Sequence, residues 1–137
     1  MAMALPPKLQ AALDLLRAMP KELKTQVLLD YAKKVPTPPK EVELERVHEC
    51  QTPFFLKAWV EEGRVRLHFF VPDEAPTVKA FAGLLKEGLE GEPPEAVLAV
   101  PPGFYRGAGL EDLLTPLRLR GLEAALLRLQ EQVRKSL

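Results

Sequence analysis

Cysteine, serine and asparagine are scarce in this chain of 137 residues, which has one cysteine (Cys50), one serine (Ser136) and no asparagine. A single cysteine cannot form an internal disulfide, so the sequence carries no sign of an oxidising compartment. A serine hydrolase needs a positioned serine, and Ser136 lies at the C-terminal end, where we expect the chain to fray. We therefore expect any chemistry of this chain to run through Cys50.

An excess of one charge is also missing, because 19 basic residues balance 19 acidic ones. This balance argues against a general binder of nucleic acid, which needs surplus Lys and Arg on one face. No run approaches eighteen consecutive apolar residues, so we expect no membrane span. The start of the chain, MAMALPPKLQ, lacks a basic segment followed by a long apolar run. We therefore predict a cytoplasmic protein without a signal peptide.

Patterns for metals and phosphate cofactors are weak. Zinc takes three or four Cys, His or carboxylate ligands, and Cys50 with His48 and His68 is a poor set. The glycines of residues 103–109 are not followed by the Lys-Ser/Thr of a P-loop. The acidic residues fall mostly on the expected solvent faces of helices, where charges are ordinary. We predict that this chain holds no cofactor or metal of its own.

The chain is rich in proline, with 14 residues, and in leucine, arginine and glutamate. Avoidance of labile amides together with prolines in loops is typical of thermophile proteins. A genome of high GC content produces a similar bias. The composition therefore favours a thermophilic source without establishing one.

Hydrophobic spacing predicts helices at both ends of the chain and strands between them. Residues 9–19, 23–35, 78–89, 94–100 and 116–133 have helical features, whereas residues 41–45, 54–60 and 64–71 read as strands. We predict one α+β domain over residues 1–137, with a three-stranded antiparallel meander and helices packed on one of its faces. Cys50 then lies in the loop between the first two strands.

The neighbours of Cys50 suit a thiol that carries a group rather than one that turns over substrate. His48 and Glu49 precede it, and Phe54 and Phe55 follow as an apolar wall that would keep the thiol protonated. No second cysteine is available to resolve an intermediate. Arginines can fold close and favour the thiolate, and two of them oppose the dipole at the start of the last helix; the candidates are Arg46, Arg64, Arg66, Arg118 and Arg120.

Two segments resemble the SufE-like sulfur acceptors. Residues 47–52, Val-His-Glu-Cys-Gln-Thr, are similar to that family's Gly-Cys-Gln-Ser loop, and residues 114–123, Leu-Thr-Pro-Leu-Arg-Leu-Arg-Gly-Leu-Glu, resemble its Leu-Thr-Pro-x-Arg-x-x-Gly-Leu-Glu signature. Residues 74–79 resemble the family's acidic helix start, which follows its third strand. The resemblance implies an α+β fold like that of iron–sulfur scaffold proteins.

The resemblance also implies a function. The family accepts persulfide sulfur from a PLP-dependent cysteine desulfurase, which it stimulates, and passes the sulfur to an iron–sulfur scaffold; the PLP belongs to the desulfurase. In this chain the resemblance assigns the persulfide to Cys50, with Gln51 and Thr52 in its loop. Arg118 matches the family arginine near that loop, and Glu74 matches an acidic family position.

Glu49 departs from the pattern because it stands where the family has glycine. A loop that requires positive φ there would be strained, and a carboxylate beside the thiol disfavours the thiolate. A docking surface for the desulfurase would include Phe54, Arg66 or the start of the Arg118 helix.

Two alternatives stay open at this point. One is an interaction module that activates a desulfurase or scaffold without using its thiol. The other is a small thiol enzyme with His48 or His68 as the base for Cys50.

Overall fold

The structure, a computed structural model, describes residues 5–137. Its elements follow the predicted order of helices, strands and helices, and the three strands form an antiparallel sheet in the order β1-β2-β3, so the predicted α+β fold is confirmed. Among residues 5–137 no helix is long and apolar enough to cross a membrane. The elements are α1 (Pro7–Ala18), α2 (Lys21–Asp30), η1 (Tyr31–Lys34), β1 (Glu45–Arg46), β2 (Phe55–Glu61), β3 (Arg64–Phe70), α3 (Pro76–Leu89), α4 (Pro94–Leu98), η2 (Leu110–Asp112) and α5 (Pro116–Ser136).

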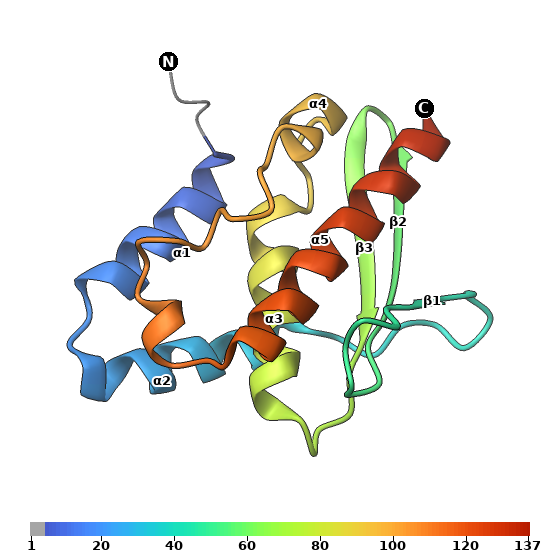
Figure 1. The fold of residues 1–137 in the computed structure, drawn as a ribbon. Coiled ribbons are helices and arrows are strands. Elements are labelled where there is room, and N and C mark those ends of the chain that lie inside the picture. The colour runs from blue at the N-terminus through green and yellow to red at the C-terminus, as the bar shows by residue number, and fades with distance from the viewer. Residues whose placement is uncertain (1–4) are drawn as a thin grey trace.

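The elements form layers, with the sheet at one side, α3 and α5 against it, and α1 and α2 beyond α3 (Figure 1). Side chains of β3 alternate between the two faces of the sheet, because Val65, Leu67 and Phe69 are buried while their neighbours face outward. The apolar stripe of α5 is also buried, and its members are Leu122, Ala125, Leu126, Leu129 and Val133. The core lies between one face of the sheet and these helices.

Helix α3 lies very close to the N-terminal helices because a glycine faces them. A Cβ built on Gly83 would lie 1.7 Å from the backbone oxygen of Tyr31, which no side chain tolerates. The helical pattern predicted for residues 23–35 changes at this contact. Helix α2 ends at Asp30, and the chain continues as the tighter 3-10 turn η1.

Side chains of α5 cover the open edge of β2. The backbone N–H of Ala58 donates to Gln132 Oε1 at 2.7 Å, and that of Val60 donates to Ser136 Oγ at 2.9 Å. An uncovered edge would invite pairing with another chain, so these bonds protect the sheet. The expectation that Ser136 merely sits at a frayed end is wrong, since its hydroxyl caps the sheet.

The first strand is shorter and later than predicted. Residues 41–45 were expected to be extended, but the chain turns at Glu41, where Val42 N–H donates to Pro39 O at 3.3 Å, and β1 is only Glu45–Arg46. These two residues pair with Phe55 and Leu56. Further along β2 the edge is taken by the α5 side chains, which leaves no room for a longer β1.

Candidate functional site

The loop that carries Cys50 is held at its two ends by buried side chains. Val47 and Phe54 have 0% exposure, and the Val47 N–H donates to Phe54 O at 2.7 Å. Phe54 also meets the Phe69 ring edge-on at a centroid distance of 5.9 Å. The residues between these anchors, 48–53, form the loop, which we call the Cys50 loop. Because Phe54 is fully buried, the expectation that it contributes to a docking surface is wrong.

Cys50 lines a hollow of about 250 Å³ between its own loop and the start of α5. The hollow is bordered by Cys50, Gln51, Thr52, Val78, Thr115, Leu117 and Arg118. The structure thus brings together the two segments, residues 47–52 and 114–123, that carry the family resemblance. Thr115 caps α5, since its Oγ1 accepts the Arg118 backbone N–H at 3.3 Å.

The thiol lies against bare backbone of α5. A Cβ built on Gly121 would have Cys50 Sγ, at 3.4 Å, as its nearest neighbour outside the helix. This glycine is buried in the helix interior, where glycine costs about 0.5–1 kcal/mol relative to alanine. Because Gly121 has no side chain, nothing from this position separates the sulfur from the backbone of α5.

Burial raises the pKa of the Cys50 thiol above its ordinary value. A hydrogen bond from the Thr52 backbone lowers it, as do the cations Arg118 and Arg46, but these effects do not outweigh the burial. The resting thiol is therefore mostly protonated at neutral pH. Arg118 is the cation that also borders the hollow.

Glu49 does not occupy the strained conformation expected for it. Among the described residues other than glycine, only Glu62 has a positive φ, so the expectation of strain at Glu49 is wrong. The Glu49 carboxylate binds the Arg128 guanidinium at 3.0 Å. A bond from its own backbone N–H and then this arginine hold the pKa of Glu49 below its usual value. The carboxylate is thus ionised and paired, which offsets its repulsion of a thiolate.

A second hollow, of about 630 Å³, follows one face of α5 next to the Cys50 loop. Leu117 and Leu127 are 45% and 50% exposed in its lining, so this hollow offers apolar surface next to the Cys50 loop. We call this the α5 hollow, and its lining is Glu49, Leu117, Arg120, Glu123, Ala124, Leu127, Arg128 and Glu131. Sequence reasoning missed this hollow. The signal that could have found it is that Leu117 and Leu127 fall outside the buried apolar stripe of α5.

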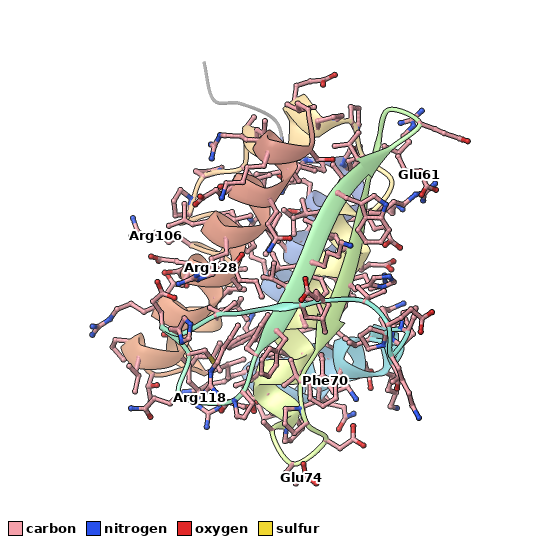
Figure 2. The ribbon with its side chains drawn as sticks, turned by 90° about the vertical axis from the view of Figure 1, so that its right-hand side faces the viewer. Glu61, Phe70, Glu74, Arg106, Arg118 and Arg128 are labelled. Carbon is pink, nitrogen blue, oxygen red and sulfur yellow. The ribbon has the colours of Figure 1, made fainter. Side chains whose placement is uncertain are left out.

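The remaining candidates lie elsewhere. Arg120 borders the α5 hollow and Arg118 the Cys50 hollow, so these two arginines serve different surfaces. Glu74 is exposed on the turn after β3, where it lines a hollow with Phe70 and Lys79. Figure 2 shows Glu74 on that turn and Arg118 near the start of α5. The structure does not bring Glu74 into the Cys50 hollow.

Neither histidine borders the Cys50 hollow. The ring of His68 lies 4.9 Å from that of Trp59, on the sheet face opposite the core, and burial lowers its pKa. Among residues 5–137 no three His, Cys, Asp or Glu side chains gather where they could hold a metal ion. The geometry therefore lends no support to an imidazole base for Cys50.

Comparisons with known proteins agree with the family resemblance. Residues 10–133 match the SufE family model, described as an Fe-S metabolism associated domain. An uncharacterized SufE-like protein of Mycobacterium tuberculosis is 44% identical over 117 residues, 82% of each chain. The cysteine desulfuration protein SufE of Plasmodium vivax is 29% identical, over 85% of this chain and 49% of that protein.

A solved structure is closer still. The solution structure of a hypothetical protein from Thermus thermophilus is 76% identical, covers 97% of this chain and 98% of its own, and superposes with a TM-score of 0.91. The source of this neighbour agrees with the thermophile-like composition.

Proposed function

The chain belongs to the SufE family, and on that premise we propose that it accepts sulfur from a PLP-dependent cysteine desulfurase and delivers it to an iron–sulfur scaffold. The observation that carries this proposal is the position of Cys50, a half-buried thiol between its loop and the start of α5, beside Arg118. A thiol that stores a group needs both shelter and a way to reach a partner. The PLP is the desulfurase's cofactor.

The transfer is a thiol–persulfide exchange. The Cys50 thiolate attacks the terminal sulfur of the desulfurase's cysteine persulfide, a bond forms between Cys50 Sγ and that sulfur, and the original S–S bond breaks. The desulfurase cysteine leaves as a thiolate, so atoms and charge balance without an external oxidant. Arg118 favours the attacking thiolate, since its cation lowers the pKa of Cys50.

Docking of the desulfurase must expose the thiol, because burial keeps the resting thiol protonated. We propose the α5 hollow as the docking surface, since its exposed leucines lie next to the Cys50 loop. Opening of the loop removes the burial that raises the pKa of Cys50, so it both uncovers the sulfur and favours its ionised form. The desulfurase should then accelerate alkylation of Cys50 by iodoacetamide.

The test is intact-protein mass after incubation with a cysteine desulfurase, PLP and cysteine, for the wild type and for Cys50→Ser. We expect the wild type to gain sulfur that a reductant removes, and the variant to gain none. Desulfurase turnover, followed as alanine released, is measured in the same samples. An absent mass gain in the wild type with an active desulfurase would overturn the carrier role.

The alternative of an interaction module is favoured by the α5 hollow alone, which a partner could fill without using the thiol. It predicts that Cys50→Ser stimulates the desulfurase as well as the wild type does. A carrier predicts that this stimulation is lost along with the sulfur uptake.

A further inference from the structure

One ion-pair cluster ties the Cys50 loop to α5. Arg128 donates from Nε to Glu49 Oε1 at 3.1 Å and from Nη2 to Glu49 Oε2 at 3.2 Å, which is the bidentate arrangement of a guanidinium on a carboxylate. Its third nitrogen, Nη1, binds Glu45 of β1. Glu45 in turn accepts from Gln132 Nε2 at 2.7 Å. Arg128, which Figure 2 shows on α5, therefore joins the helix, the first strand and the loop.

We propose that Glu49 and Arg128 are positioning residues that hold the Cys50 loop closed, and that breaking their pair releases the thiol. We call the pair the Glu49–Arg128 latch. The proposal deepens the proposed function, on which its biological use rests, but the closing of the loop can be measured without any desulfurase. Neither residue touches the sulfur in this account; both act through the position of the loop.

The loop has few other ties in its middle. Its anchors, Val47 and Phe54, lie outside the moving part, and the Cys50 N–H bonds to Val47 O at 3.2 Å within the same turn. Gly121 offers the thiol no side chain to pack against. Among the described residues, Glu49 is the loop member whose side chain hydrogen-bonds α5. Loss of that bond would leave the loop held by its two ends and by the packing of the partly buried Cys50 against the core.

The latch is breakable because water reaches it. The side chains of Glu49 and Arg128 are 53% and 25% exposed, so water and salt can replace their contact. An exposed ion pair shifts the equilibrium between the closed and the open loop by a factor of up to about five. A contact of this strength keeps a loop closed most of the time, yet a docking protein can overcome it.

The latch also lies where a partner would meet it. Glu49 and Arg128 line the α5 hollow together with Leu117 and Leu127. A partner that fills this hollow and presents a carboxylate to Arg128 would compete with Glu49 for the guanidinium. Docking and release of the thiol would then be one event, which would protect the stored sulfur until the acceptor or donor is in place.

The experiment measures the alkylation rate of Cys50 by neutral iodoacetamide in the free protein, for the wild type, Glu49→Gln, Arg128→Gln and the double variant. We expect each single variant to react about five times faster than the wild type. The double variant should be no faster than Arg128→Gln alone, because loss of Arg128 already removes the contact that Glu49→Gln breaks. Added NaCl should accelerate the wild type and leave Glu49→Gln unchanged.

The matched control is Glu131→Gln, which removes another exposed carboxylate of the α5 hollow, one paired with Lys135 at 3.2 Å and not with the loop. Val133→Ala controls for global stability, since it weakens the core of α5 without touching the loop. Unchanged rates in Glu49→Gln, additive effects in the double variant, or an equal acceleration in either control would overturn the latch. A failed sulfur transfer in the wild type would overturn the proposed function and leave the latch standing.

Discussion

Helix α5 makes two kinds of contact along its length: hydrogen bonds that fix the sheet, and contacts to the Cys50 loop that water can replace. At its C-terminal end, Gln132 and Ser136 bond to backbone N–H groups of β2 at 2.7 and 2.9 Å, and Leu129 and Val133 are fully buried. Ala58 is buried, so its N–H would stay within the protein if it lost its partner, at a cost of about 1–3 kcal/mol. This end of the helix therefore fixes the sheet.

Over residues 121–128, which precede that end, α5 holds the Cys50 loop through contacts that water can replace. Gly121 gives Cys50 only backbone to lie on, and Arg128 grips Glu49 in an exposed ion pair. Separating these groups leaves charges that water solvates, so the loss is small. Helix α5 thus supports the sheet at its C-terminal end and holds the Cys50 loop releasably over residues 121–128. The difference arises because the groups that it contacts differ in their access to water.

The largest effect is expected from breaking the fixed end with Gln132→Ala. The Ala58 N–H loses its acceptor and Glu45 loses a donor, so we expect the free energy of unfolding to fall by about 1–3 kcal/mol. Urea unfolding measures the loss, and hydrogen exchange of the Ala58 amide locates it. Glu131→Gln, an exposed change one residue away, should leave both unchanged. Equal stability of Gln132→Ala and the wild type would contradict the claim that the C-terminal end of α5 fixes the sheet.

Sequence periodicity found the core but not these polar contacts. The stripe of α5 from Leu122 to Val133 was predictable because apolar residues at helical spacing must share one face. Nothing local in the sequence says that Gln132 or Ser136 will meet β2, since that contact spans 74 or 76 residues of chain. Long-range hydrogen bonds depend on how the layers pack, which spacing does not encode.

The site was predictable in part for the same reason. Cys50 and Arg118 were joined through the resemblance of two distant segments, and the structure places both at one hollow. Glu49 was expected to be strained because its position, and not its partner, was considered. Arg128 went unnoticed, since on the sequence it is one more charged residue on a helix. Its importance comes from Glu49, 79 residues earlier.

Gly121→Ala, in the part of α5 that holds the Cys50 loop, is expected to have a smaller effect of opposite sign on the free energy of unfolding. The added Cβ would lie 3.4 Å from Cys50 Sγ, an ordinary contact, and alanine is the better helix former. We expect the free energy of unfolding to rise by about 0.5–1 kcal/mol and alkylation of Cys50 to slow. Thermal unfolding and iodoacetamide labelling test this. The larger Gly121→Val should push the loop away and speed labelling; a slower reaction of that variant would argue against the close fit.

The smallest effect is expected from Arg118→Gln, which changes the charge near the thiol and leaves the contacts of α5 with β2 and with Glu49 in place. Burial raises the pKa of Cys50 and the Arg118 cation lowers it, so removing the cation should move the titration of the thiol to still higher pH. The thiolate absorbance of this single cysteine follows the titration directly, with Cys50→Ser as the background. Arg120→Gln is the matched control, because Arg120 borders the α5 hollow and not that of the thiol. Equal midpoints for the two arginine variants would mean that Arg118 does not act on the sulfur. A higher midpoint of the thiol titration only in Arg118→Gln would establish that the start of α5 supplies the positive charge that favours the attacking thiolate.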